Sequence, residues 1–438
     1  MTVTADAVRA PLSGGGRVAV LGDRSARLLA GPPAPVGAEP YGDHLKRLGI
    51  APTMDVDELV ALAAHAGLCG RGGGDFPLAT RLQTAAAAAD RGGRRPLVVV
   101  NGAEGEPASR KDRVLLETRP HLVLDGAEVA AAALDADVVV YAESASTAWS
   151  SLENAVGERR FSHRSVHLVD APKRYVAGES SAVVATLEGR GPVPGRRSLP
   201  VAARGVGGRP TVVSNTETLG HLALAARFGA SWFVAGGPEA IPGSTLLTLA
   251  GAVARPGQVV EAVGTPTFGD VLRDHGGLLA PPGAVLLGGY AGHWVGGASA
   301  WDSNVDRGAL RRAGMGLGCG VVAVLPHGAC GLAVTAELVG YLAGQSAGQC
   351  GPCVFGLAAL AEEMRSLADG RASARDLRRL PRTAGAVRGG GDCSHPDGVA
   401  GLVESALAVF ADDARRHVRT GPCRAAHPGW FPIPRGQR

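Results

Sequence analysis

Cysteines in the last quarter of the chain are spaced as metal ligands often are. Cys350 and Cys353 form a C-x-x-C pair, and Cys393 follows in the segment C-S-H-P-D-G. This pattern is typical of iron–sulfur and zinc ligation, and a thiol at a helix start is more readily deprotonated. A fourth ligand is required, for which Cys423 and His395 are the candidates. The pattern predicts an iron–sulfur cluster or a Cys3His zinc site, with three unrelated thiols as the alternative.

A second group of reactive residue types lies in the glycine-rich segment 67–77, G-L-C-G-R-G-G-G-D-F-P. Because glycine has no side chain, the backbone N–H groups of such a loop can surround an anion. Arg71 offers a planar donor for phosphate, and Phe76 offers a flat apolar face. The combination favours a nucleotide that has both phosphate and ring. The alternative is an ordinary loop, because a single glycine-rich loop is a weak signal and no clear strand precedes this one.

Two carboxylates follow the apolar run 97–100, L-V-V-V, which fits a buried parallel strand. Glu104 and Glu106 lie among glycines at the end of this run, where open α/β sheets bind ligands. Segments 175–182 and 211–218 each open a predicted helix. Helix N-termini attract anions, although ordinary capping is the alternative for each segment.

Alternating strands and helices are expected to position these groups. A helix over 55–66, with Asp55 and Glu58 as a capping pair, leads into the glycine-rich loop. Strand–helix alternation continues to residue 169 and predicts an α/β layer. Short strands and turns over 243–324 predict a small β-rich domain. The helical patterns that follow predict a bundle with helices near 330–343, 351–368, 374–386 and 399–418.

The overall composition excludes several classes of protein. The chain has 44 basic and 40 acidic residues, which is too balanced to favour nucleic-acid binding. No apolar run reaches about 18 residues, so we expect no membrane span. Seven cysteines without an export signal predict a reducing, cytoplasmic location and no disulfide framework.

The motifs occur in a single order, and in that order the chain resembles a known family over about residues 50–420. It is similar to the NADH-binding flavoprotein subunit of respiratory complex I and to related subunits of NAD-linked hydrogenases and formate dehydrogenases. The segments that carry the resemblance are 67–77, 101–113, 175–182, 205–218 and Q-C-G-P-C at 349–353.

The resemblance implies an α/β protein with three functional domains. It implies a Rossmann-like FMN-binding domain, a small ubiquitin-like β-grasp domain and a C-terminal helical bundle that holds a 4Fe–4S cluster. The implied boundaries are an N-terminal extension at 1–49, then domains at 50–240, 241–328 and 329–423, and a flexible tail at 424–438.

Roles for individual residues are carried over by motif match. The FMN phosphate would bind the loop at Gly70–Gly74 near Arg71, Glu106 would face the nicotinamide with Glu104 beside it as the second catalytic carboxylate, and Phe76 would stack on the adenine. The complete implied cofactor-binding set is Gly70, Arg71, Gly72, Gly73, Gly74, Phe76, Arg81, Asn101, Glu104, Tyr175, Gly178, Glu179, Ser214, Asn215 and Thr218. The expected metal ligands are Cys350, Cys353, Cys393 and Cys423.

The implied activity is that of an NAD(P)H dehydrogenase. A hydride would pass from NADH or NADPH to FMN, and single electrons would pass through the cluster to a ferredoxin-like or thioredoxin-fold 2Fe–2S partner. Departures from the family pattern support an alternative, a non-catalytic assembly subunit with a zinc or absent cluster. Ala347 replaces the first cluster cysteine, Thr84 and Pro200 replace aromatic residues, and Asp75 replaces a glycine. A β-grasp ligand-binding protein is a third, weaker interpretation.

Overall fold

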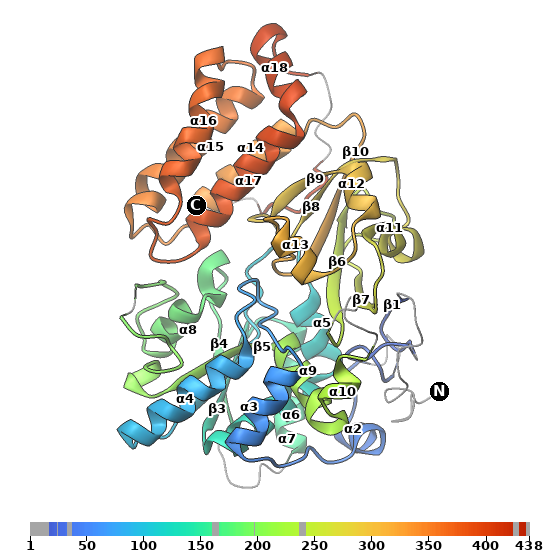
Figure 1. Ribbon diagram of the computed structural model, residues 1–438, viewed down its shortest axis with the longest axis vertical. Coiled ribbons are helices and arrows are strands. Elements are labelled where there is room, and N and C mark those ends of the chain that lie inside the picture. Colours follow the sequence, from blue (N-terminus) through green and yellow to red (C-terminus); the bar gives the residue numbers. More distant parts are fainter. Residues whose placement is uncertain are drawn as a thin grey trace.

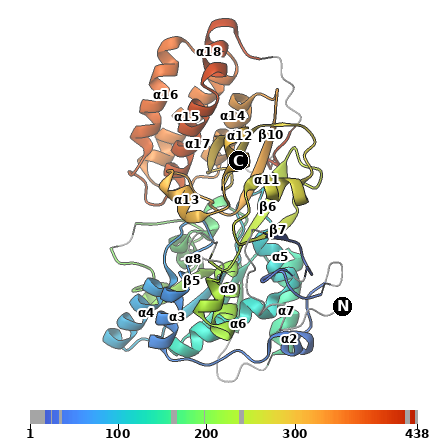
Figure 2. The same cartoon turned by 45° about the vertical axis from the view of Figure 1, so that its right-hand side comes forward.

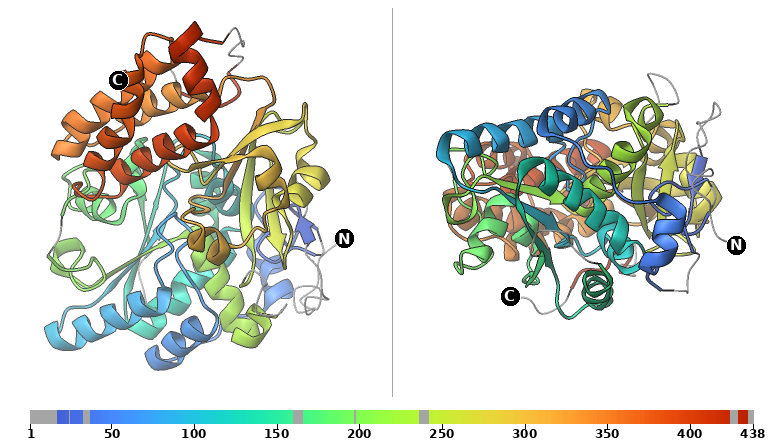
Figure 3. Two further views of the ribbon diagram at one scale, coloured as in Figure 1. Left: turned by 45° about the horizontal axis from the view of Figure 1, so that its top comes forward. Right: turned by 90° about the horizontal axis from the view of Figure 1, so that it is seen from below.

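The computed structural model describes residues 17–23, 25–32, 37–159, 166–196, 198–235, 242–423 and 429–434. These residues form a parallel sheet flanked by helices, a second mixed sheet and a helical bundle (Figure 1). Figures 2 and 3 show the mixed sheet and the bundle side by side, next to the parallel sheet. The mixed α/β architecture predicted from the sequence is confirmed.

The parallel sheet brings two predicted motifs together. Its strand order is β4-β3-β2-β5, with β2 at Leu97–Asn101, β3 at Asp137–Ala142, β4 at Val166–Asp170 and β5 at Thr211–Asn215. β2 and β5 pair in parallel with Asn101 opposite Asn215. From β2 the chain continues to β3 on one side, whereas β5 is added on the other side of β2. Where the strand order changes direction in this way, a parallel sheet has a crevice at the carboxyl ends of its strands.

Helices cover both faces of the parallel sheet, which explains why β2 and the middle of β3 are runs of buried apolar residues. Asp55 and Glu58 form the predicted capping box at the start of α3. The elements associated with this sheet are α2 (Tyr41–Leu48), α3 (Val56–His65), α4 (Leu78–Gly92), α5 (Lys111–Thr118), α6 (Pro120–Leu134), α7 (Thr147–Glu158), η1 (Tyr175–Gly178), α8 (Ser180–Leu187), η2 (Val206–Gly208), α9 (Thr216–Phe228) and α10 (Ala230–Phe233).

The second sheet has six strands in the order β1-β7-β6-β10-β8-β9. β10 runs parallel to β6 and antiparallel to β8, so the sheet is mixed. Its elements are β1 (Arg17–Ala19), β6 (Thr245–Gly251), β7 (Val259–Val263), α11 (Phe268–Val271), η3 (Leu272–Gly276), β8 (Pro282–Leu287), β9 (His293–Gly296), α12 (Gly297–Asp302), α13 (Arg307–Arg312) and β10 (Val321–Pro326). β1 comes from the expected N-terminal extension, whose residues 17–19 are therefore part of this sheet.

The C-terminal bundle packs on β9, where the backbone N–H of Trp294 donates to Ser405 of α17 at 3.0 Å. The helix expected over 399–418 is two helices, because the chain turns at Phe410. The elements of the bundle are α14 (Gly331–Gly344), η4 (Pro352–Gly356), α15 (Leu357–Ala368), α16 (Ala374–Val387), α17 (His395–Val409) and α18 (Ala411–Thr420).

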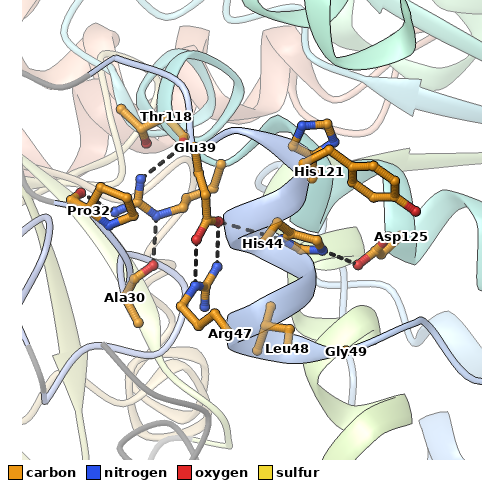
Figure 4. A network of polar contacts seen from close by, with 12 residues as sticks. Ala30, Pro32, Glu39, His44, Arg47, Leu48, Gly49, Thr118, His121 and Asp125 are labelled. Atoms are coloured by element: carbon orange, nitrogen blue, oxygen red, sulfur yellow. Dashed lines mark hydrogen bonds and ion pairs between the residues drawn. The ribbon is translucent and has the colours of Figure 1, made fainter. Parts of the chain in front are cut away.

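A buried polar network fixes the segment before α3 to the rest of the protein (Figure 4). Arg47 donates two hydrogen bonds of 2.7 Å to Glu39, and His44 contacts Asp125 of α6 at 2.6 Å. Burial alone would raise the pKa of Glu39, but Arg47 and His44 lower it to about 2. Each charge in the network has a partner, as buried charges require.

The expected flexible ends are only partly described. Residues 1–16, 424–428 and 435–438 lie outside the described residues. Within the expected C-terminal tail, Phe431 is buried against the rings of Tyr290 and Trp294. This part of the tail is packed against the protein because it carries an aromatic side chain that covers the second sheet.

Candidate functional site

A cavity of about 470 Å³ lies where the two sheets and the bundle meet. Its volume falls in the range of about 300–1,000 Å³ that is usual for small-molecule sites. The predicted residues that line it are Gly72, Gly73, Gly74, Asn101, Glu104, Glu106, Tyr175, Gly178, Glu179, Asn215 and Cys393. The predicted residues that do not line it are Gly70, Arg71, Phe76, Arg81, Ser214, Thr218, Cys350, Cys353 and Cys423.

The glycine-rich loop presents bare backbone to this cavity. Gly73 has a φ of +102°, a conformation that residues with a side chain rarely adopt. Within the described part of the chain, the amides of Gly72, Gly73 and Gly74 donate no hydrogen bond to a protein acceptor. Unpaired amides on a loop beside a cavity are the donor set that a phosphate requires, so the loop fits the phosphate of FMN.

Arg71 does not fill the role expected for it. Its guanidinium is buried and donates to Thr245 Oγ1 at 3.3 Å and to the Pro242 carbonyl at 3.1 Å. Its backbone N–H donates to Thr218 Oγ1 at 2.9 Å. Burial lowers the pKa of Arg71 to about 10, and Glu217 supplies a compensating negative charge nearby. Arg71 and Thr218 therefore anchor the loop to its surroundings and do not face the cavity.

Three other predicted residues also lie away from the cavity. Arg81 donates to the Val213 carbonyl, and its guanidinium lies 5.7 Å from the ring centroid of Phe76. Phe76 is half exposed, so its ring is open to a partner from solution. Ser214 is buried, and its hydroxyl has no hydrogen-bond partner among the described residues.

The acidic residue of the loop is neutralised by the second sheet. Asp75 forms ion pairs with Arg307 at 2.9 Å and with Arg311 at 3.2 Å. An unpaired carboxylate would oppose a phosphate on this loop, but one paired with two arginines does not. The substitution of Asp for Gly therefore joins the loop to α13 and does not disable the loop.

Glu104 is held at the N-terminus of α5. It accepts hydrogen bonds from Ser109 Oγ at 2.6 Å, the Asp112 amide at 3.2 Å and the Arg113 amide at 3.1 Å. Burial and the charge of Asp112 raise the pKa of Glu104, while its donors lower it. Its oxygens are thus engaged in capping, which gives this predicted catalytic residue a structural role in the site.

Glu106 is a buried titratable group that lines the cavity. Its carboxylate accepts from the Tyr290 amide at 2.8 Å, Tyr175 Oη at 3.1 Å and the Ala108 amide at 3.2 Å. Burial outweighs these donors and raises the pKa of Glu106 to about 7. Cys319 lines the same cavity. A Cβ at Gly289 would lie 2.6 Å from Glu106 Oε2, so only glycine fits there.

A buried lysine, Lys111, contacts Asn215 and two carboxylates. Lys111 Nζ contacts Asp112 Oδ1 at 2.8 Å, Asn215 Oδ1 at 3.1 Å and Glu217 Oε2 at 3.1 Å. Burial would lower the pKa of Lys111, but the carboxylates of Asp112 and Glu217 raise it above its ordinary value. No local sequence pattern indicates this ion group, because its members become neighbours only when α5 packs against α9 and the residue that precedes it.

We expect the substitution Lys111→Met to destabilise the apoprotein by about 3–5 kcal/mol, because it leaves two buried carboxylates without their cation. Urea unfolding would measure this loss. Lys173→Met is the matched control: Lys173 is exposed and pairs with Glu143, so its loss should cost at most about 1 kcal/mol. Equal effects of the two substitutions would contradict the role given to Lys111.

The three cysteines predicted as ligands lie near one another at the start of η4 and α17. Cys353 shares a hydrogen bond with Cys350 and interacts electrostatically with Cys393. Burial raises the pKa of the Cys350 thiol, but the amides of Asp392 and Cys353 lower it below its ordinary value. Amide donors around a thiol favour the thiolate, which is the form that binds metal. Burial instead raises the pKa of Cys353 and of Cys393. The three residues fit a metal centre because they are metal-binding side chains that lie close together.

His395 also has one ring nitrogen without a hydrogen-bond partner. Its Nε2 donates to the Leu342 carbonyl at 2.9 Å, which leaves the lone pair of a neutral ring on Nδ1. Nδ1 has no partner among the described residues, and His395 is 7% exposed and lines the cavity.

Cys423 lies elsewhere and cannot join these thiols. Its sulfur lies with Cys330 and His417, and all three ligand atoms fall within 4.8 Å of one another. Cys330 immediately precedes α14, whereas Cys350 follows its C-terminal end. A helix of 14 residues spans roughly 21 Å, so the two groups are at opposite ends of α14. The expectation that Cys423 completes the first group is therefore wrong.

Among the described residues, none of the helices has the length and apolar character needed to cross a membrane.

Comparisons with known proteins agree with this geometry. A family model described as the Nuo51 FMN-binding domain matches residues 63–223, and a model of the NADH-ubiquinone oxidoreductase-F iron-sulfur binding region matches residues 333–417. The first match contains the glycine-rich loop and Glu106. The second contains Cys350, Cys353 and Cys393 and ends before Cys423.

Curated relatives and solved structures point to the same family. The F subunit of NADH-quinone oxidoreductase in Mycobacterium tuberculosis is 30% identical, covering 85% of this chain and 87% of the relative. An F subunit of the same enzyme in Rhizobium meliloti is 28% identical, covering 84% and 90%. A chain of the NAD+-reducing [NiFe]-hydrogenase in its H2-reduced state has a TM-score of 0.74 at 27% identity, covering 84% of this chain. This chain spans 63% of that hydrogenase chain. The resemblance inferred from the motifs is thereby confirmed, and the chain belongs to the family of NADH-quinone oxidoreductase F subunits.

Proposed function

We propose that this protein is an FMN-dependent NADH dehydrogenase module that passes electrons to an iron–sulfur cluster in its bundle. One observation carries the proposal. A single cavity is lined by the unpaired amides of Gly72–Gly74, by Glu106 and by Cys393. The loop amides would hold the phosphate of a flavin, and Cys393 brings a thiol of the proposed metal centre to the same cavity. The matches to an FMN-binding and an iron–sulfur-binding family model support both cofactors.

Each part of the cavity has a distinct task. FMN, when bound, accepts a hydride from the nicotinamide and releases its electrons singly to the cluster. The amides of Gly72–Gly74 bind the phosphate. Asn101, whose Nδ2 donates to the Gly178 carbonyl at 2.8 Å, and Asn215, which caps α9, hold the strand ends in position. Glu106 holds a proton at its carboxyl group below about pH 7, and its ionised form disfavours additional negative charge in the cavity.

For the metal centre we propose Cys350, Cys353 and Cys393 as thiolate ligands and His395 Nδ1 as the fourth. The unpartnered lone pair of His395, two residues after Cys393, supports this assignment. Ala347, which replaces a family cysteine, gives a reason why a different residue is needed. Iron and sulfide analysis distinguishes the electron-transfer module from a non-catalytic subunit.

Several finer assignments are proposals of the same kind. We retain the division at 50–240, 241–328 and 329–423, with β1 added to the second unit and the six-stranded mixed sheet interpreted as the β-grasp domain. A ferredoxin-like or thioredoxin-fold 2Fe–2S protein is our proposed acceptor. All seven cysteines are free thiols, which supports a reducing, cytoplasmic location.

We expect Glu106 to impose a pH dependence on the stability of the apoprotein. Its pKa in the folded state, about 7, is above the ordinary value of 4.5. Its contribution is therefore fully present below pH 4.5 and is lost as the pH rises through 7, a change of about 3 kcal/mol. Urea unfolding at pH 5 and pH 8 should show the stability of wild type, relative to Glu106→Gln, falling with pH. The exposed Glu153→Gln is the control, and a difference that does not change with pH would refute the assignment.

Steady-state assays test the proposed function. Protein reconstituted with FMN, iron and sulfide should oxidise NADH with ferricyanide as the acceptor, and Glu106→Gln should lower kcat/KM without loss of bound flavin. Bound flavin with no oxidation of NADH or NADPH would instead support the non-catalytic subunit.

A further inference from the structure

A second group of metal-binding side chains lies at the far end of the bundle from Cys350. It consists of Cys330 immediately before α14, His417 in the last turn of α18, and Cys423 three residues after α18 ends. Their two sulfurs and one ring nitrogen lie within 4.8 Å of one another. The distance from Cys330 Sγ to His417 Nε2 is 3.6 Å. Tetrahedral zinc places its sulfur and nitrogen ligands roughly 3.5–3.8 Å apart, so this pair already has the required separation.

The imidazole of His417 is turned so that Nε2, the nitrogen with the lone pair, lies beside Cys330 Sγ and the Cys423 amide. Because the Leu367 carbonyl can only accept, His417 Nδ1 donates to it at 3.1 Å, and Nε2 of the neutral ring keeps the lone pair. A hydrogen bond from the second ring nitrogen to a backbone carbonyl is the usual support of a metal-binding histidine. The Cys423 amide lies 3.2 Å from the same Nε2, and this contact would be exchanged for the metal bond.

The three residues are buried on the side of Cys330 and His417 and partly exposed to solvent on the side of Cys423. Cys330 and His417 are 2% and 1% exposed, whereas Cys423 is partly exposed. A Cβ at Gly370 would lie 2.5 Å from Pro422 Cδ, so the chain just before Cys423 is seated directly on the turn after α15. A metal ion could therefore enter from the side of Cys423 and be held by two ligands fixed in the core.

We propose that Cys330, His417 and Cys423 bind one Zn²⁺ ion, with solvent in the fourth position, and that this ion fastens the chain after α18 to the start of α14. Two thiolates and an imidazole are ligands that zinc favours. The site is independent of the proposed electron transfer, because it shares no residue with the group at Cys350, Cys353 and Cys393 and lies at the opposite end of α14.

Zinc content and affinity test the proposal. The full chain is produced as Cys353→Ser, which removes a ligand of the other metal centre, and is incubated with Zn²⁺ against a chromophoric chelator. We expect about one bound Zn²⁺ per chain. Adding Cys423→Ser or His417→Gln should weaken binding by at least about 100-fold, since the loss of a supporting partner alone costs 10–100-fold. Cys69→Ser, a partly exposed thiol outside both groups, should leave the affinity unchanged.

Cobalt substitution and thermal unfolding supply readouts that do not depend on activity. Bound Co²⁺ should show thiolate charge-transfer absorption that disappears in Cys423→Ser, and Zn²⁺ should raise Tm only when all three ligands are present. Equal zinc binding with and without Cys423 and His417 would overturn the proposal. So would a Cys330–Cys423 disulfide, found by mass spectrometry in protein purified without reductant, that persists in the presence of Zn²⁺.

Discussion

The substitution Gly73→Val is expected to give a folded protein that loses most of its bound flavin. Gly73 has a φ of +102°, and the atom nearest to a Cβ built there is in the Gly318 backbone, at 3.8 Å. A β-branched residue disfavours this φ and would turn the amides of Gly72–Gly74 away from the phosphate. We expect bound FMN, measured by its fluorescence after acid release, to fall at least about tenfold, which corresponds to about 1.4 kcal/mol of binding free energy.

A matched glycine distinguishes loss of binding from loss of folding. Gly229 follows α9 with a φ of +87° and has no atom within 4 Å of a built Cβ. Gly229→Val should therefore carry a similar backbone strain and retain its flavin. Flavin retained in full by Gly73→Val, or lost equally from both variants, would show that the loop does not bind the phosphate.

Replacement of Cys353 by serine is expected to remove the iron from the protein. Cys353 is buried beside Cys350 and interacts with Cys393, so its loss breaks the C-x-x-C pair on which a cluster depends. Iron and sulfide analysis of anaerobically purified protein should show a full complement in wild type and almost none in Cys353→Ser.

Cys423→Ser is the natural control, because Cys423 lies with Cys330 and His417 at the other end of α14. Its iron content should equal that of wild type, while Cys393→Ser should behave like Cys353→Ser. Iron lost from Cys423→Ser but kept in Cys353→Ser would reverse the assignment of the two groups.

The sequence predicted those parts of the fold that are encoded locally. The apolar run 97–100 became β2, and the Asp55–Glu58 capping box starts α3. The strand β1 was not predicted, because three residues pair with β7 only through a contact more than two hundred residues away in sequence. The break at Phe410 was missed because a continuous apolar periodicity runs across it.

The sequence predicted the cavity-lining residues whose position depends on the backbone. It misplaced the residues whose position depends on the direction of the side chain. Gly72–Gly74, Asn101 and Glu106 line the cavity because strand ends and turns put them there. Arg71 does not face the cavity because its hydrogen-bond partners Thr245 and Pro242 and the charge of Glu217 lie elsewhere. No local sequence pattern predicts these partners.

The two cysteine groups show the same difference between what local spacing predicts and what long-range packing decides. The C-x-x-C spacing grouped thiols that are neighbours in the chain. The long-range partners of Cys423 could not be predicted from spacing, because they depend on how the fold brings the start of α14 near the end of α18.

The most direct measurement is an anaerobic titration of the reconstituted protein with NADH, followed by visible absorption and by EPR at low temperature. The flavin absorption should bleach, and a signal from a reduced iron–sulfur centre should appear that is absent from Cys353→Ser. Flavin that stays oxidised at excess NADH, in protein shown to contain both FMN and iron, would contradict electron entry at this cavity.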